Sequence, residues 1–258
     1  MVVLTMDTAT DALSVAVGRM EDGAVEVAAA AASLVQRGHS RLLQPLAMQV
    51  CQTAGVEPGD LEGIVVGVGP GSYTGVRLAV STAKAMALVL GVPVLPVSTL
   101  WALAEAACPD QTAASWLVMP LVYARRRRAF GALYHKRFGV WRTLEEERVR
   151  PVGEWSSRMA DAAAHLSEPE GPPLCLVTDD FRESHHVLPE LSIAPLHTRA
   201  PLAAVAGGLG PALLRLAAAG AATWRRGDEV HEIEPMYGLA VEAEVKLEEA
   251  KGRGHGQL

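Results

Sequence analysis

The sequence predicts an α/β fold, and two observations support this prediction. Residues 2–6, 12–18 and 24–32 are apolar or alternating stretches that fit three successive strands. Asp22-Gly23 is a hairpin signal between the last two. From residue 38 onwards, helical periodicity alternates with short β-branched runs. This order, a meander and then β-α units, resembles the ribonuclease-H-like pattern found in each half of actin-like ATPases.

The first half contains three predicted helices. Ser40 is the expected N-cap of the first helix, which ends before Gly55. The second helix covers residues 76–90. Ser98 caps the third helix, which extends to residue 107. The strands between these helices are predicted at residues 64–68 and 94–97.

The second half has a less regular pattern. Strands are predicted at residues 116–122, 129–134, 141–149 and 174–178, and helices at 153–166 and 202–219. We therefore expect an N-terminal lobe (residues 1–100), a C-terminal lobe (101–240) and a charged, mobile tail (241–258) that begins as a fraying helix. The helix at residues 202–219 is expected to pack back on the first lobe.

Composition restricts the classes of protein. Hydrophobic residues make up 50% of the chain, which is enough for a sizeable core. The formal net charge of -6 argues against nucleic-acid binding by the whole surface, although it leaves room for a local basic patch. Cys51, Cys108 and Cys175 form no C-x-x-C pair, so buried free thiols are expected. With no signal peptide and no apolar run of about 18 residues, the expected location is the cytoplasm.

A glycine-rich loop between a predicted strand and a predicted helix is the strongest local motif. It reads Gly67-Val-Gly-Pro-Gly-Ser-Tyr-Thr-Gly75. It lacks the G-K-[ST] of a Walker loop, and Ser72 stands where the dinucleotide-binding fingerprint has its third glycine. The loop is either a tight structural turn, with Ser72 or Thr74 capping the next helix, or a phosphate contact through free amides at the helix start.

Two charged segments also have two interpretations each. Asp7 ends the first strand beside Thr8 and Thr10, and it either caps a turn or faces a nucleotide phosphate and its metal. The run Arg125–Arg128 is either a solvated turn or a phosphate contact.

Hydrolase and metal chemistry have little support in the sequence. A nucleophile elbow requires glycines at the positions of Pro70 and Thr74, which flank Ser72. His39 at a helix start is more typical of a cap or surface residue than of a base. The histidines form no H-E-x-x-H or H-x-x-x-H pattern, so no metal site is expected.

The helix predicted at residues 76–90 is apolar on two faces. One face carries small residues four positions apart, namely Ala79, Ala83 and Ala87. The second face is lined by Leu78, Thr82, Ala85 and Val89. One face should cover the helix's own sheet. The other is buried either within this chain or against a second subunit.

Four segments resemble the TsaB (YeaZ) family in order and spacing. They are Asp7-Thr-Ala-Thr10, Gly38-His39-Ser40, Gly69-Pro-Gly-Ser-Tyr-Thr-Gly-Val-Arg77 and Pro96-Val-Ser-Thr-Leu100. The resemblance covers roughly residues 1–105. It implies two ribonuclease-H-like lobes of the actin/Hsp70/sugar-kinase superfamily. It also implies a heterodimer with the catalytic paralogue TsaD, joined by the ATPase TsaE, that transfers threonylcarbamoyl to N6 of adenosine 37 in tRNA.

The resemblance also implies roles for residues of this chain. The paralogue binds a metal through H-x-x-x-H, and the matching positions here are Thr99 and Leu103, which implies a non-catalytic dimerisation and scaffold subunit. The implied partner interface is Leu42, Leu43, Leu46, Val76, Ala79, Val80, Ala83 and Ala87. The residues expected to face a nucleotide or phosphate are Asp7, Thr8, Thr10, Gly69, Gly71, Ser72 and Thr74. No cofactor is assigned, and ATP or ADP at the complex interface stays an open alternative. A homodimer of the chain alone is a second open alternative.

The second half departs from the family pattern. In the D-A-R-x-x-E-V-Y segment, Tyr123 replaces the aspartate, and Ala129 or Phe130 replaces the glutamate. In the P-x-Y-[LV]-R segment near Pro235 and Tyr237 the arginine is missing. Two other functions remain as alternatives: an active actin-fold ATPase or small-molecule kinase that uses Asp7 and the glycine-rich loop, and a peptidase that uses Ser72 and His39.

Overall fold

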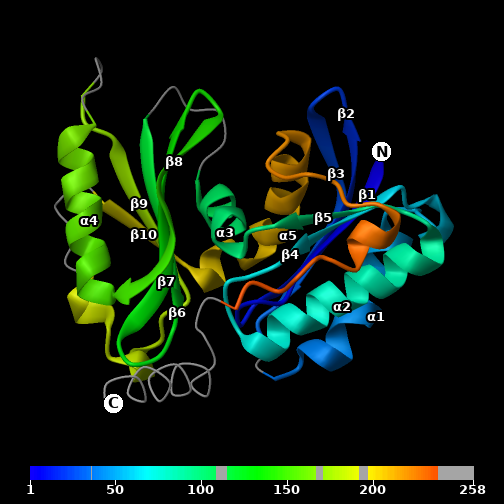
Figure 1. Cartoon of the computed structure of the whole chain (residues 1–258), viewed down its shortest axis with the longest axis horizontal. Coiled ribbons are helices and arrows are strands. Elements are labelled where there is room, and N and C mark those ends of the chain that lie inside the picture. The colour runs from blue at the N-terminus through cyan, green and yellow to red at the C-terminus, as the bar shows by residue number, and fades with distance from the viewer. Residues whose placement is uncertain (36, 109–114, 167–170, 192–196, 238–258) are drawn as a thin grey trace, which may run out of the picture.

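The computed structural model describes residues 1–35, 37–108, 115–166, 171–191 and 197–237. These residues form two five-stranded sheets (Figure 1). The first has the order β3-β2-β1-β4-β5 and contains β1 (Val2–Asp7), β2 (Leu13–Glu21), β3 (Ala24–Ser33), β4 (Gly63–Gly67) and β5 (Val94–Val97). The second has the order β10-β9-β6-β7-β8 and contains β6 (Trp116–Tyr123), β7 (Arg128–Arg137), β8 (Val140–Pro151), β9 (Leu174–Asp179) and β10 (His197–Pro201).

The two sheets repeat one topology. In each, three antiparallel strands form a meander, and two more strands are added in parallel beside the first strand of the meander. β6 therefore corresponds to β1, and the β6–β7 turn corresponds to the β1–β2 turn. This arrangement confirms the predicted α/β fold of two ribonuclease-H-like lobes, although the sequence shows no internal repeat.

In the described residues, five α-helices separate and cover the sheets. They are α1 (His39–Thr53), α2 (Tyr73–Leu90), α3 (Thr99–Ala107), α4 (Val152–His165) and α5 (Leu202–Ala218). α1 and α2 pack on the outer face of the first sheet, and α4 packs on the outer face of the second. α3 and α5 fill the layer between the two sheets (Figure 1). No helix in the described part of the chain is long and apolar enough to span a membrane.

Local chemistry explains the helix starts. Ser72 and Ser98 cap α2 and α3, since their hydroxyl oxygens accept hydrogen bonds from Gly75 N and Trp101 N. α2 therefore begins at Tyr73, three residues before its predicted start. The prediction of Ser40 as a cap is wrong: α1 begins at His39, with Gly38 as its N-cap.

The chain returns to the first lobe after β10. α5 packs on β1, β2 and β3. Gly210 N donates to Ser14 Oγ on β2 at 3.0 Å, and Gly210 O accepts from Thr5 Oγ1 on β1 at 3.0 Å. Residues 221–237 then run along the same lobe. Arg225 and Val94 exchange two backbone hydrogen bonds, and Met236 N donates to Val68 O at 2.7 Å. The predicted tail helix after residue 241 lies outside the described residues.

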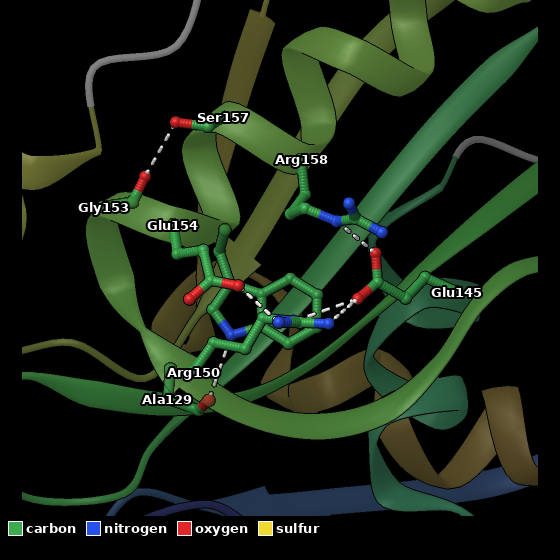
Figure 2. Close-up of polar contacts among 8 residues, drawn as sticks. Ala129, Glu145, Arg150, Gly153, Glu154, Ser157 and Arg158 are labelled. Atoms are coloured by element: carbon green, nitrogen blue, oxygen red, sulfur yellow. Dashed lines mark hydrogen bonds and ion pairs between the residues drawn. The ribbon is translucent and has the colours of Figure 1, made fainter.

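An ionic cluster fixes α4 to the strand before it (Figure 2). Glu145 on β8 accepts from Arg150 Nη2 at 2.7 Å and from Arg158 Nε at 2.8 Å. Burial acts to raise the pKa of Glu145, but the hydrogen bonds from Arg158 and Arg150 outweigh it and lower this pKa. The guanidinium of Arg150 also lies 5.6 Å from the ring centre of Trp155, whose indole N–H donates to Ala129 O.

A buried carboxylate connects the two lobes. Glu105 on α3 is 4% exposed. It accepts from Lys136 Nζ on β7 at 3.0 Å, from Trp141 Nε1 on β8 at 2.7 Å and from Arg215 Nε on α5 at 2.6 Å. A single side chain thus joins the middle helical layer to the second sheet.

We expect Glu105→Ala to lower the free energy of unfolding by about 3–5 kcal/mol, since the buried Lys136 and the half-buried Arg215 both lose this carboxylate. Urea denaturation monitored by circular dichroism measures this change. Glu146→Ala, at an exposed position on β8, is the control and should change stability by less than about 0.5 kcal/mol. A similar small loss for both variants would show that the Glu105 cluster does not hold the lobes together.

Candidate functional site

A fully buried carboxylate lies where β1, β4 and β5 end. Asp7 is 0% exposed, and its Oδ1 accepts from Ala9 N at 2.7 Å. Its Oδ2 accepts from Thr99 Oγ1 at 2.7 Å, and this hydroxyl accepts in turn from Gly69 N at 3.1 Å. Burial raises the pKa of Asp7, although the Ala9 amide and the Thr99 hydroxyl act to lower it. One side chain therefore links the end of β1 to the glycine-rich loop and to the start of α3.

The glycine-rich loop packs directly on the turn after β1. A Cβ atom on Gly67 would lie 1.8 Å from Asp7 Oδ2, and one on Gly75 would lie 2.0 Å from Thr8 O. Thr8 Oγ1 donates to Gly75 O at 2.6 Å. Ser72 N donates to Ala9 O at 2.6 Å. The glycines are required because the two backbones are in contact, and the loop closes over residues 7–9.

This closure decides the accessibility of the residues predicted to face a phosphate. Asp7, Thr8, Thr10 and Gly69 are buried, Gly71 is half-buried, and Ser72 and Thr74 are exposed. The acceptor atoms of Asp7 and the hydroxyl of Thr8 already have protein partners. A phosphate that reached this corner would meet Ser72 and Thr74 first, so contact with the buried four would require the loop to move.

Ser72 and His39, the residues that the peptidase alternative would use, are each hydrogen-bonded to another group. Ser72 Oγ accepts from Gly75 N at 3.3 Å as a helix cap. His39 Nε2 lies 3.1 Å from Asp11 O, and burial lowers the pKa of this histidine more than the nearby Asp7 raises it. Each side chain thus has a structural partner of its own.

The predicted partner interface requires a correction. Six of its eight residues face the core of this chain and are at most 3% exposed: Leu43, Val76, Ala79, Val80, Ala83 and Ala87. Their prediction as interface residues is wrong, because the core of this chain buries them. The small-residue stripe lets α2 approach its own sheet. Leu42 and Leu46 are half-buried.

Other residues form the exposed surface of these two helices. Met48 on α1 is 47% exposed, and Leu88 and Val89 on α2 are 52% and 86% exposed. Ser81 and Ala85 are also exposed. These five residues are called the outer α1–α2 surface below. Sequence periodicity identified the two apolar faces of α2 but not which of them the sheet covers.

The second lobe has its own polar site at the corresponding edge. Asp179, at the end of β9, is 0% exposed and accepts two hydrogen bonds from Arg199, at 2.6 and 2.8 Å. Asp180 Oδ1 accepts from Tyr123 N at 2.7 Å. Burial raises the pKa of Asp180 to about 7, and the charge of Asp179 adds to this effect. Arg182 forms an ion pair with Asp11 and so connects this edge to the first lobe.

The β6–β7 turn at this edge has an unusual backbone. Arg125, Arg126 and Arg127 have φ angles of 62°, 50° and 57°, so three consecutive residues are left-handed. For residues with a Cβ this conformation costs roughly 1–2 kcal/mol each, and glycine or asparagine normally occupies it. The sequence indicated a basic turn but gave no sign of this strain.

The raised pKa of Asp180 predicts a specific pH dependence. The folded protein binds a proton at this carboxylate between pH of about 4 and 7, whereas the unfolded chain does not. This group therefore reduces stability as the pH rises through that window, by up to about 1.4 kcal/mol per pH unit. We expect Asp180→Asn to flatten the pH dependence of the free energy of unfolding, measured by urea titrations from pH 4 to 7. Asp161→Asn, on the exposed side of α4, should leave it unchanged. An identical pH profile for parent and Asp180→Asn would contradict the assignment.

Comparison with known proteins agrees with this fold. Residues 31–186 match the family model described as "TsaD: tRNA N6-adenosine threonylcarbamoyltransferase". An uncharacterized Pseudomonas aeruginosa protein, described as similar to peptidase YeaZ, superposes with a TM-score of 0.67 at 25% identity, over 92% of this chain and 98% of that one.

Two curated relatives carry the name "tRNA threonylcarbamoyladenosine biosynthesis protein TsaB". The Escherichia coli protein is 34% identical over 57% of this chain and 61% of its own length, so the match spans less than two thirds of that relative. The Bacillus subtilis protein is 32% identical over 69% of this chain and 72% of its own length. With the family model, the shared two-lobed fold and the glycine-rich loop in agreement, the chain belongs to the TsaB/YeaZ family.

Proposed function

We propose that this chain is a non-catalytic dimerisation and scaffold subunit for the threonylcarbamoylation of N6 of adenosine 37 in tRNA. It would pair with the paralogue TsaD, which supplies the catalytic site, and the ATPase TsaE would join the pair in the cytoplasm. The observation that carries this proposal is the closed corner around Asp7, where the polar groups of Asp7, Thr8 and Thr99 are hydrogen-bonded within the protein.

The two positions matching the paralogue's metal-binding histidines support this proposal. Thr99 is 0% exposed, and its hydroxyl donates to Asp7 and accepts from Gly69 N. Leu103 is 0% exposed in the apolar layer between the sheets. A hydroxyl held between two protein groups and an aliphatic side chain do not supply the imidazole ligands of such a metal site. This constellation stabilises the fold instead.

The outer α1–α2 surface is the best-supported place for the partner. It carries Val89, Leu88 and Met48 as exposed apolar side chains, and Ser81 and Ala85 are small exposed residues on the same helix as Val89. Two helices from each partner packed on this surface would form a four-helix contact. Such an interface becomes stable when a few well-packed apolar anchors lose their water. The same surface would serve a homodimer when the chain is alone.

A nucleotide, if the complex binds one, would meet this chain at the exposed start of α2. Ser72 and Thr74 lie there, beside the ring of Tyr73, which is 50% exposed. ATP or ADP would then lie at an interface between subunits and not inside this chain. Turnover of ATP by the isolated chain is not expected, because Asp7 and Thr8 are sealed beneath the loop.

The decisive experiment reconstitutes modification of an unmodified tRNA with this chain, TsaD, TsaE and threonylcarbamoyl-adenylate precursors, omitting each protein in turn. We expect Val89→Arg to abolish modification and to weaken pairing with TsaD at least about 10-fold, because a charge is placed in an apolar contact. Its melting temperature should equal that of the parent, since Val89 is 86% exposed. Ala83→Arg is unsuitable as a test, because Ala83 is 0% exposed and the change would disrupt the core.

Val140→Arg is the matched control. Val140 is 70% exposed but lies on β8 of the second lobe, so this variant should pair and support modification like the parent. If Val89→Arg pairs normally, the interface lies elsewhere. If the chain is dispensable for modification and hydrolyses ATP alone, the scaffold proposal is wrong and the ATPase function replaces it.

A further inference from the structure

Two exposed tyrosines and an arginine meet at the start of α2. The ring centroids of Tyr73 and Tyr237 are 4.8 Å apart, and these residues are 50% and 41% exposed. The guanidinium carbon of Arg77 lies 4.7 Å from the centroid of the Tyr73 ring and 5.9 Å from that of the Tyr237 ring. Cation–π attraction of this kind positions a long, exposed side chain. These three residues are called the Tyr–Arg cluster below.

The cluster joins two segments that are distant in sequence. Two of its members are one helical turn apart on α2, whereas Tyr237 belongs to residues 221–237, which return to the first lobe and lie beside α2 (Figure 1). Met236 N donates to Val68 O at 2.7 Å, and Lys84 Nζ on α2 donates to His231 O at 2.8 Å. These bonds hold the returning segment in place, so the exposed rings are preorganised. A preorganised surface loses less entropy on binding than a flexible one does.

The composition of this cluster is typical of a protein interface. Tyrosine and arginine are enriched among the residues that contribute most to binding energy, and methionine is enriched at interfaces in general. Met236, next to Tyr237 in the chain, is 41% exposed and adds apolar area. The backbone bond of Met236 already fastens the returning segment, so the exposed ring faces and the guanidinium are available to a partner.

The cluster is continuous with the outer α1–α2 surface. Exposed residues recur every four positions along α2, at Tyr73, Arg77, Ser81, Ala85 and Val89. Residues at this spacing form a ridge that crosses the exposed face of a helix obliquely. At 1.5 Å per residue this ridge is about 24 Å long. Its small central side chains let a partner helix approach closely, and its larger residues stand at the two ends. The surface available to a partner therefore extends along the whole of α2.

The charge of the two helices indicates the chemistry of the partner. α1 and α2 together contain Arg41, Arg77 and Lys84 but no aspartate or glutamate. The whole chain has the opposite balance, with a formal net charge of -6. A surface of this kind favours an acidic partner face. A second copy of this chain would bring the same two helices, so it could reach Arg77 only with carboxylates outside them, such as the exposed Glu234.

We propose that the Tyr–Arg cluster anchors the partner interface, and that Arg77 binds a carboxylate on an acidic helix of the partner subunit. This inference rests on the proposed function, in which the outer α1–α2 surface pairs with TsaD. A guanidinium can keep its flat face on aromatic rings while the N–H groups of its edge bind both oxygens of a carboxylate. A protein fits better than RNA, because Ser81, Ala85 and Val89 continue the ridge with small or apolar side chains that suit helix packing.

The test measures the affinity of the full chain for TsaD by titration calorimetry. Arg77→Ala should weaken pairing at least about 10-fold. Arg77→Lys should recover only part of this loss, because an ammonium group keeps the charge but lacks the paired donors. The affinity of the parent should fall more steeply with rising salt than that of Arg77→Ala. Both variants should melt at the parent's temperature, since Arg77 is exposed.

Matched controls come from the second lobe. Arg142 is exposed on β8, and Phe138 is a 66% exposed aromatic residue between β7 and β8. Arg142→Ala and Phe138→Ala should pair with TsaD like the parent, whereas Tyr73→Ala should weaken pairing as Arg77→Ala does. Equal weakening by Arg77→Ala and Arg142→Ala would show a general effect of charge and would overturn the proposal.

The remaining outcomes separate this inference from the proposed function. If Val89→Arg loses TsaD while Arg77→Ala and Tyr73→Ala pair like the parent, the inference alone is wrong. If Arg77→Ala weakens a homodimer of the isolated chain but not the pair with TsaD, the cluster binds a second copy and the inference is again wrong. The same holds if the variant loses affinity only for a tRNA transcript. If the parent chain does not pair with TsaD at all, the proposed function itself fails.

Discussion

The hydrogen bonds of one buried carboxylate organise the first lobe. Asp7 ends β1, receives the amide of the turn that follows it, and receives the hydroxyl of Thr99 from the start of α3. Thr99 is also bonded to Gly69 in both directions, through its hydroxyl and through its own amide. Three segments from a stretch of the sequence in which the outermost two lie 92 residues apart therefore share one polar centre. A carboxylate without water is stable only with such partners, so the glycine-rich loop, the turn and the helix start are fixed together.

This constraint bears directly on function. The polar groups that resemble a phosphate site in the sequence are the same groups that satisfy one another in the structure. The glycines bring the loop close to the backbone of residues 7–9 instead of leaving room for a ligand. The glycine-rich loop thus seals the first of the two equivalent turns. The equivalent turn of the second lobe instead carries three exposed arginines.

Much of the fold could be predicted because its determinants are local. The Asp22-Gly23 hairpin and the Ser98 cap depend on the chemistry of a few neighbouring residues. β10 was missed because its sequence, His-Thr-Arg-Ala-Pro, has no apolar run, and its position depends on pairing with β9. The interface residues were misassigned because their environment also depends on packing with distant segments. Periodicity shows that α2 has two apolar faces, but only the packing shows that the face containing Ala83 is covered by its own sheet.

The return of the chain to the first lobe has a consequence for how the protein is made. The first sheet is complete in sequence by Val97, yet α5 and residues 221–237, which cover it, are synthesised more than 100 residues later. The second lobe is in effect an insertion within the first, and it can form its meander before the first lobe is finished. Until α5 emerges from the ribosome, the inner face of the first sheet lacks its main apolar cover. Loss of the segment after β10 would therefore damage the lobe at the opposite end of the sequence more than the lobe it directly follows.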